Sequence, residues 1–255
     1  MQENTLLEKR SALLKLSQTL GLQEHSLAIL GEGNVSARVD ETTFIVKASG
    51  SSLATMQESD LVHCNMGPLL PLLEKREVTD EEMENTLLAC RIDPKSGKPS
   101  IETLFHVYLL GVGGIEFVAH THPRTVNQIL CSPMARDFAE HRLCPDQIVY
   151  CGVASAFVPY TDPGLPLARA IREQTESFVN RYRNTPQTVL LENHGLITLG
   201  RTAQAVLAAT LMMEKSARIF VGAASLGGPK FLTDENAQRI ARRPDEEYRR
   251  RWARL

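Results

Sequence analysis

The chain has 255 residues, 43% of them hydrophobic, and its 28 basic and 30 acidic side chains give a formal net charge of −2. This length suits one large domain or two small ones, with enough apolar residues for a sizeable core. The nearly balanced charge gives no electrostatic case for a nucleic-acid partner or an anionic membrane surface. No apolar run approaches the roughly 20 residues that span a bilayer.

Cysteine usage and the N-terminus indicate the cellular compartment. The five cysteines are odd in number and show no C-x-x-C spacing, which favours reduced thiols in a cytosolic protein over a disulfide framework. Residues 1–4 lack the basic segment and the apolar core of a secretory signal. We therefore expect a cytoplasmic protein.

The first part of the chain predicts a helix and then short strands. Leucines recur at helical spacing within residues 5–30, and Gly31 and Gly33 are expected to end that helix. Alternating apolar residues on both sides of a turn at Asp40 predict a hairpin, and another short strand follows it. These strands cover residues 34–39, 43–48 and 61–65.

Two later helix starts carry capping signals. Thr79 and Glu82 have the spacing of a capping box, which opens a helix toward Cys90. Ser100 is a good N-cap for the next helix. In that helix apolar residues recur at i, i+3, i+4, i+7 and i+8 over residues 101–109, which predicts one buried face.

The second half of the chain mixes strands with helices. A strand over residues 115–120 leads into a helix that opens at Pro123, a favoured first-turn residue. Further strands are predicted at residues 147–151, 154–158, 187–192 and 195–199. Further helices are predicted at residues 164–181 and 202–224, with two short ones after residue 228 that break at Arg243-Pro244. Because no repeat or linker interrupts this pattern, it predicts one α/β domain over residues 1–255 with a mostly antiparallel central sheet.

Three histidines stand at the ends of two predicted strands. His120 and His122 are two residues apart, so a strand directs both side chains to one face. His194 follows a second apolar run. Two histidines from one strand end and one from another are the ligand set of a catalytic zinc site with one open position.

A histidine at a strand end is also often an ordinary hydrogen-bonded surface residue, and an H-x-H pair arises by chance. The other four histidines show no such pairing, and we interpret them as surface or core residues: His25, His63, His106 and His141.

Glu102 and two glycine-containing loops each admit two interpretations. Two residues past Ser100, Glu102 is placed either to favour the helix dipole or to act as a general acid/base beside a metal. The loops at residues 31–36 and 48–52, like the helix start at Ser100, offer main-chain N–H groups and Asn or Ser side chains that suit phosphate oxygens. Neither loop matches a P-loop or a dinucleotide fingerprint, and each also suits an ordinary turn.

Five motifs occur in one order: G-N-x-S near residue 34, S-G near 50, P-S-x-E-T near 100, H-T-H-P at 120 and N-H-G at 194. Together they resemble the class II aldolase/adducin family, of the L-fuculose-1-phosphate aldolase type. The resemblance covers about residues 5–225 and leaves 228–255 as a C-terminal helical extension. It implies a three-layer α/β/α domain around a central antiparallel sheet, in a homo-oligomer, usually a homotetramer, with sites between subunits.

The resemblance also implies roles. His120, His122 and His194 match the zinc ligands, and Glu102 matches the catalytic acid/base. The residues that match contacts to the substrate phosphate are Asn34, Ser49, Gly50 and Ser100. The implied activity, with Zn²⁺ or another divalent metal as cofactor, is that of an aldolase. It would cleave or form a carbon–carbon bond in a small ketose or ketose 1-phosphate through a metal-stabilised enediolate.

Two departures from the family pattern concern the substrate. Ile101 stands where fuculose-phosphate aldolases commonly have a second phosphate-binding serine, and isoleucine cannot donate a hydrogen bond. This points to weaker phosphate binding or to a substrate without phosphate. The tyrosine that a neighbouring subunit supplies in those aldolases has no clear match, and Tyr150 and Tyr160 are loose candidates.

Three alternatives to the aldolase reaction stay open within the family. Its decarboxylases and pentulose-phosphate 4-epimerases need the same metal, although the epimerases commonly carry Asp at the position of Glu102. Adducin-like members are non-catalytic binding modules that lack the metal histidines, which this chain keeps.

Overall fold

The computed structural model describes residues 2–252, so Met1 and residues 253–255, at the ends of the predicted domain, lie outside the described residues. Its strands are β1 (Asn34–Arg38), β2 (Thr43–Lys47), β3 (Leu61–Asn65), β4 (Phe117–Thr121), β5 (Ala156–Val158), β6 (Thr188–Leu191) and β7 (Gly195–Gly200). They form one sheet in the order β3-β2-β1-β4-β7-β6-β5. All neighbours are antiparallel except the parallel pair β5–β6, which confirms the mostly antiparallel sheet.

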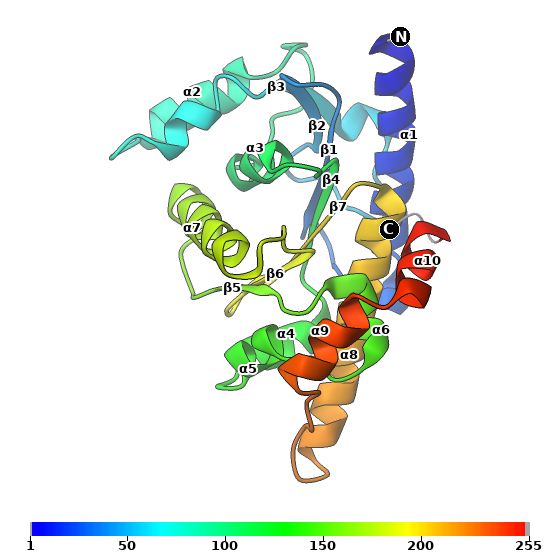
Figure 1. The fold of residues 1–255 in the computed structure, drawn as a ribbon. Coiled ribbons are helices and arrows are strands. Elements are labelled where there is room, and N and C mark those ends of the chain that lie inside the picture. The colour runs from blue at the N-terminus through cyan, green and yellow to red at the C-terminus, as the bar shows by residue number, and fades with distance from the viewer. Residues whose placement is uncertain (1, 253–255) are drawn as a thin grey trace.

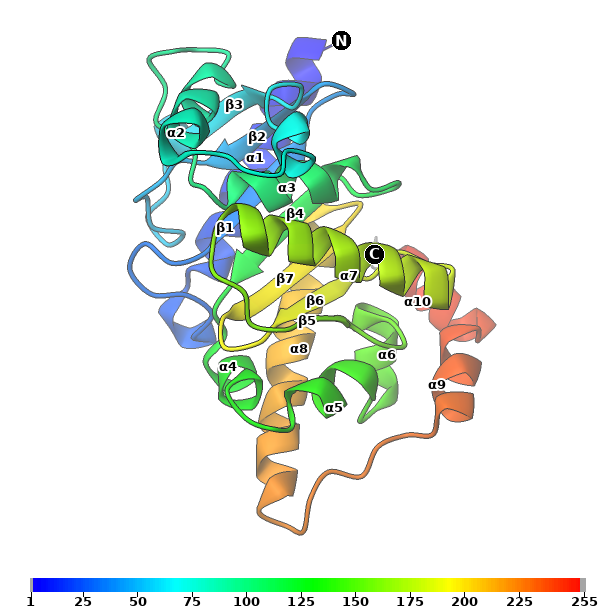
Figure 2. The same ribbon diagram turned by 90° about the vertical axis from the view of Figure 1, so that its left-hand side faces the viewer.

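Helices cover both faces of this sheet and make three layers (Figure 1). One face carries α2 (Asp80–Ala89), α3 (Thr103–Gly111) and α7 (Leu165–Tyr182), which Figure 2 shows from the front. The other face carries α1 (Gln2–Leu20), α4 (Arg124–Leu130), α5 (Ala135–Glu140), α6 (Pro145–Cys151) and α8 (Ala203–Ala224). The three-layer α/β/α fold implied by the resemblance is therefore confirmed.

Shorter elements complete the chain. The 3₁₀ turns are η1 (Gln23–His25), η2 (Glu58–Asp60) and η3 (Leu70–Leu73), and the last helices are α9 (Asp234–Ala241) and α10 (Pro244–Trp252). The two final helices match the short pair predicted after residue 228, and both pack against α6. Within residues 2–252, no helix combines the length and the apolar character that crossing a bilayer requires.

The alternation of strand side chains decides which residues face α3. On β4, Phe117 and Ala119 belong to the core shared with α1, whereas Val118 belongs to the core shared with α3 and α7. Because side chains alternate along a strand, His120 also faces α3. On β1, Val35 and Ala37 belong to the α1 core. Asn34, before Val35, and Ser36, between Val35 and Ala37, therefore face α3 and form part of the site described below.

The first predicted helix is shorter than expected. It ends at Leu20 rather than near residue 30, because Gly21 lies against the backbone of a distant loop. A Cβ at Gly21 would stand 2.2 Å from the backbone nitrogen of Ala54. The Ser17 hydroxyl donates to the Leu53 carbonyl oxygen at 3.1 Å and fixes the same contact. A tertiary contact therefore sets the helix end.

The prediction of a strand at residues 147–151 is wrong, because these residues lie in α6. Pro145 occupies the first turn of that helix, where its fixed φ favours helical geometry. The Gln147 side chain accepts a hydrogen bond from the Leu143 N–H at 2.8 Å, and Ile148 packs against α9. The Pro start and tertiary packing outweigh the strand propensity of Ile148 and Val149.

Of the two predicted caps, one is confirmed and one is wrong. Thr79 caps α2, since its hydroxyl accepts from the Glu82 N–H at 3.1 Å. Ser100 does not cap α3, which begins at Thr103 and has Glu102 at its N-cap position. The Ser100 hydroxyl oxygen is instead buried, without a hydrogen-bond partner among the described residues.

Candidate metal centre and anion pocket

The three histidines predicted as metal ligands meet at one end of the sheet. β4 and β7 are antiparallel neighbours that pair Thr121 with Leu196, so the end of β4 lies beside the turn that precedes β7. The ring centroids are 4.8 Å apart for His120–His122, 4.9 Å for His120–His194 and 5.1 Å for His122–His194. One nitrogen of each ring lies within 4.8 Å of the others.

The turn between β6 and β7 explains the N-H-G motif. Asn193 has a φ of 54°, in the left-handed region that asparagine tolerates better than most residues. Gly195 leaves space for the other two histidines. A Cβ there would lie 2.9 Å from Cδ2 of His122 and 3.0 Å from Cε1 of His120. Asparagine thus permits the turn that presents His194, and glycine permits the close approach of the other rings.

A hydrogen bond orients the His120 ring so that its Nε2 lies close to the Nε2 of His122. Nδ1 of His120 lies 3.1 Å from the Leu196 carbonyl oxygen and donates to it, which leaves Nε2 as the free acceptor. This Nε2 is 3.0 Å from Nε2 of His122. On the far side of that second ring, Nδ1 lies 3.7 Å from a carboxylate oxygen of Glu32. A carbonyl or a carboxylate behind the ring is typical of metal-bound histidine.

His120 and His122 have the protonation state that metal binding requires. Burial lowers the pKa of His120 to about 3, and burial likewise lowers the pKa of His122. Neutral imidazoles offer a lone pair to a cation, whereas imidazolium ions do not. The cluster therefore fits a divalent metal held by three protein ligands with one position open.

Glu102 lies beside the cluster. One of its oxygens, Oε1, is 3.5 Å from Nε2 of His194 and 3.8 Å from Nε2 of His120. The other, Oε2, accepts a hydrogen bond from the Asn34 side-chain amide. Burial alone opposes ionisation, but these three partners outweigh it and hold the pKa of the Glu102 carboxyl well below its usual range. A helix-dipole role does not account for these contacts.

The residues expected to bind a phosphate come from two segments that the fold joins. Ala48 and Pro99 form an isolated antiparallel bridge, and the Ser49 N–H donates to the Lys98 carbonyl oxygen at 2.8 Å. Ser49 and Gly50 thereby adjoin Ser100. At Gly50, φ is 83° and an added Cβ would meet nothing within 4 Å. The open space and the unpartnered Ser100 hydroxyl leave hydrogen-bonding capacity for a ligand.

Asn34 is the one expected phosphate contact that does not lie with Ser49, Gly50 and Ser100. Its side chain is 4% exposed, and its amide nitrogen donates to Glu102. Asn34 pairs with His120 across β1 and β4, so it lies between the metal cluster and α3. The structure therefore places this residue against the carboxylate.

The sequence analysis missed two charged residues of this site. Glu32 supports His122 from a loop that we interpreted as an anion loop or an ordinary turn. Lys47, 4% exposed, donates from Nζ to the carbonyl oxygens of Ser51 at 2.6 Å and Ala48 at 3.3 Å. Burial lowers the Lys47 pKa, whereas Glu102 and Asp60 favour its charged form. The sequence held one signal for Lys47 as a site residue, since a lysine stands in an otherwise apolar strand two residues before the S-G motif.

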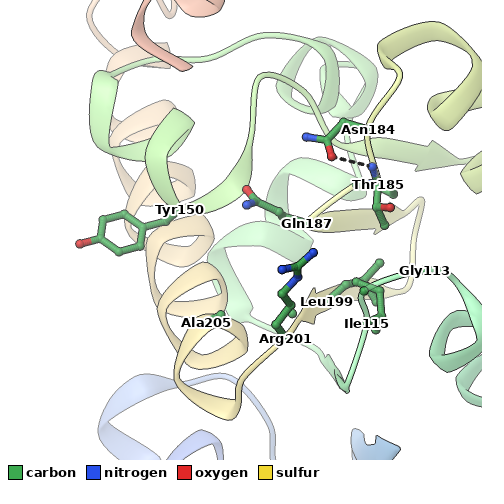
Figure 3. A pocket seen from close by; sticks show the side chains of 12 residues that line it. Gly113, Ile115, Tyr150, Asn184, Thr185, Gln187, Leu199, Arg201 and Ala205 are labelled. Atoms are coloured by element: carbon green, nitrogen blue, oxygen red, sulfur yellow. Dashed lines mark hydrogen bonds between the residues drawn. The ribbon is translucent and has the colours of Figure 1, made fainter. Parts of the chain in front are cut away.

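The two tyrosine candidates lie far apart. Tyr150 lines a cavity of about 190 Å³ together with Gln187 and Arg201, which Figure 3 shows. This cavity lies beyond Gly200, at the end of β7 opposite to the histidines. Tyr160 lies nearer to them, because its N–H donates at 2.9 Å to Glu192, two residues before His194.

A substitution at Gly195 tests the cluster without replacing any proposed ligand. We expect Gly195→Ala to displace His120 and His122 and to weaken Zn²⁺ binding by about 10- to 100-fold, the usual effect of disturbing groups that orient metal ligands. Titration calorimetry with Zn²⁺ on the metal-free protein measures this.

Gly222→Ala is the matched control, because a Cβ at that position on α8 meets nothing within 4 Å. It should bind Zn²⁺ as the unchanged protein does, and His122→Ala should lose the ion. Unchanged Zn²⁺ affinity in Gly195→Ala would contradict the assigned cluster.

Comparison with known proteins places this chain in a family. Residues 12–221 match the model of the class II aldolase and adducin N-terminal domain. The "uncharacterized oxidoreductase YuxG" of Bacillus subtilis is 33% identical over 201 residues. These residues are 75% of this chain but 26% of that protein, so the chain spans about a quarter of that relative.

Two further proteins match over nearly their whole length. The 3-oxo-tetronate 4-phosphate decarboxylase of Haemophilus influenzae is 25% identical over 243 residues, which cover 94% of this chain and 99% of that protein. A solved L-fuculose 1-phosphate aldolase superposes with a TM-score of 0.70 and 19% identity, over 95% of this chain and 96% of the other. At that identity the structural match establishes the fold. With the family match running through most of its length, the chain belongs to the class II aldolase/adducin family.

Proposed function

We propose that this protein is a zinc-dependent aldolase that cleaves or forms a carbon–carbon bond in a small ketose, with a ketose 1-phosphate as the favoured form. One observation carries the proposal: three histidines and the Glu102 carboxylate face one space. Next to them, the buried Ser100 hydroxyl has no hydrogen-bond partner among the described residues. A metal site, an acid/base and an anion pocket are the three parts that this reaction needs.

The roles follow from the contacts. His120, His122 and His194 would hold the ion, which when bound supplies Lewis-acid stabilisation of negative charge on substrate oxygens. Glu102 turns Oε1 to the same space. As a resting carboxylate, it suits a base that takes a proton from the donor ketone in the direction of synthesis and returns it in the direction of cleavage.

The anion pocket supports a phosphorylated substrate. Ser49, Gly50 and Ser100 offer hydrogen-bond donors, and the Lys47 ammonium lies beneath the same loop. Ile101 contributes no donor. A Cβ at Gly164 would come within 2.8 Å of its side chain, so Ile101 packs against the start of α7. The positive charge of Lys47 offsets the missing hydroxyl, because a buried cation favours an anionic ligand.

A decarboxylase of a phosphorylated sugar acid is the second candidate. The relative from Haemophilus influenzae is named as such a decarboxylase, and the match covers 99% of that protein. Both reactions use a metal, an acid/base and a phosphate contact, so they differ in the product released. The glutamate at position 102 counts against an epimerase, and the intact histidine cluster counts against a non-catalytic module.

Metal analysis and turnover together test the first candidate. We expect about one zinc ion per chain, and release of dihydroxyacetone phosphate from a panel of ketose 1-phosphates. Glu102→Gln keeps the size of the side chain but cannot cycle a proton. It should keep the metal and lower kcat by roughly 10²- to 10⁴-fold.

Carbon dioxide as the product from a sugar acid phosphate, without dihydroxyacetone phosphate from any ketose 1-phosphate, would select the decarboxylase instead. Turnover of Glu102→Gln near that of the unchanged enzyme would remove Glu102 from the chemistry.

Kinetics on paired substrates test the phosphate pocket. Ser100→Ala should raise the KM for a ketose 1-phosphate by about tenfold, the cost of one hydrogen bond to a charged group. The same change should leave the KM for the corresponding free sugar within about twofold, and inorganic phosphate should compete only with the phosphorylated substrate.

Ser225→Ala is the control, because that hydroxyl donates to a carbonyl oxygen at the end of α8. Equal effects of Ser100→Ala on both substrates would argue against the pocket and for a substrate without phosphate.

We also propose that a second copy of the chain, within a homotetramer, covers the site. Two apolar side chains next to the metal cluster are open to solvent: Ile29 is 61% exposed and Leu30 is 84% exposed. They follow Leu27, whose carbonyl oxygen accepts from the His122 N–H at 2.8 Å. Exposed apolar groups that border a reaction site suit an interface that also excludes water.

Sedimentation velocity tests this assembly. The unchanged protein should sediment as a closed oligomer, and Leu30→Ser should weaken the assembly and lower turnover while the metal content stays the same. A monomeric protein with full activity at working concentration would refute the proposed interface.

A further inference from the structure

We propose that His106 is a positioning residue, which acts through Asn34 to hold the Glu102 carboxylate in one orientation. The inference rests on the proposed role of Glu102 and adds a residue that touches neither metal nor substrate. His106 is 0% exposed and stacks on Phe105 at a centroid distance of 4.7 Å.

The contacts form one unbroken chain. The Ser36 hydroxyl lies 2.6 Å from Nδ1 of His106, Nε2 of His106 contacts the amide oxygen of Asn34, and the amide nitrogen of Asn34 contacts Oε2 of Glu102. Two residues of β1 alternate in it with one residue of α3 and the N-cap residue of that helix. This is possible because Asn34 and Ser36 share one face of β1, while residues 102 and 106 lie one turn apart at the start of α3.

The direction of each hydrogen bond follows from its end at Glu102. The nitrogen of the Asn34 amide donates to Oε2 of Glu102, so the amide oxygen faces His106. An amide oxygen only accepts, so Nε2 of His106 carries the hydrogen. Burial lowers the pKa of His106 to about 3, and a neutral imidazole has a single N–H. Nδ1 is therefore an acceptor, and the Ser36 hydroxyl donates to it.

This series of hydrogen bonds decides which end of the Asn34 amide meets the Glu102 carboxylate. The two ends of an amide have nearly the same shape, so packing alone discriminates poorly between them. With the oxygen turned toward Oε2, two acceptors would face each other in a buried site, which is costly. The donor on His106 fixes the productive orientation. It thereby keeps Oε2 occupied and Oε1 directed at the histidine cluster.

Two substitutions at position 106 separate positioning from packing. Phenylalanine keeps a ring against Phe105 but has no donor, whereas glutamine has no ring but places an N–H near the position of Nε2. We expect His106→Phe to lower kcat by about 10- to 100-fold, with KM and zinc content unchanged. His106→Gln should stay within about threefold of the unchanged enzyme. If His106 only fills space, the order reverses, with phenylalanine tolerated and glutamine harmful.

A double substitution tests whether His106 acts through Asn34. His106→Phe combined with Asn34→Ala should lose no more turnover than Asn34→Ala alone, because the single change already breaks the chain. Independent, additive losses would overturn the proposal. If a position-106 variant folds poorly, Ser36→Ala can take its place in the same double-substitution cycle. It removes the hydroxyl that donates to His106.

Crystal structures of the zinc-loaded variants give a readout that does not depend on the reaction. In His106→Phe the hydrogen bond from Asn34 to Oε2 should be lost and the carboxylate rotated, and in His106→Gln both should be kept. An unmoved Asn34 and Glu102 in His106→Phe would refute the positioning role whatever the substrate is. Absence of aldolase product in the unchanged enzyme would instead refute the proposed function and leave this comparison valid.

Discussion

The register of β4 between β1 and β7 is the constraint on which the site depends. This register pairs Asn34 with His120 on one side and Thr121 with Leu196 on the other. A slip of one residue would turn His120 away from α3 and into the apolar layer against α1, because strand side chains alternate between the faces. The same slip would turn Phe117 and Ala119 out of the core against α1 and toward α3. Core packing and site assembly are therefore enforced by a single set of backbone hydrogen bonds.

The electrostatics of the site depend on this arrangement. Glu102 carries a negative charge beside His120, which burial keeps neutral. A buried charge is costly unless hydrogen bonds or an opposite charge compensate it. The Asn34 amide compensates part of it, and a divalent cation held by the three histidines would compensate the rest and leave net positive charge. With the Lys47 ammonium beneath the neighbouring loop, such a site suits an anionic substrate.

Local patterns in the sequence predicted the parts of this arrangement that depend on local geometry. His120 and His122 follow from the period of a strand, and the hairpin of β1 and β2 follows from its turn. Glu32, Lys47 and His106 were missed as site residues because their roles depend on partners 70 to 90 residues away or on loop closure around them.

The spacings N-x-S and E-x-x-x-H were visible in the sequence. Which face of β1 meets which side of α3 was not. The errors at Ser100 and at residues 147–151 have the same cause, since tertiary contacts set where a helix begins and whether a β-branched segment becomes one.

The start of α3 links the three parts of the site. Ser100 ends the segment that bridges to the anion loop, Glu102 faces the metal histidines, and His106 stands one turn later behind Asn34. A rigid helix transmits a small displacement of its first turn to all of these groups together. Pairing at Pro99 on one side and the hydrogen-bonded chain through His106 on the other hold that turn from both directions. The proposed anion pocket and the proposed acid/base are thereby kept at a constant separation, which would suit a substrate with its phosphate and reacting carbon at a set distance.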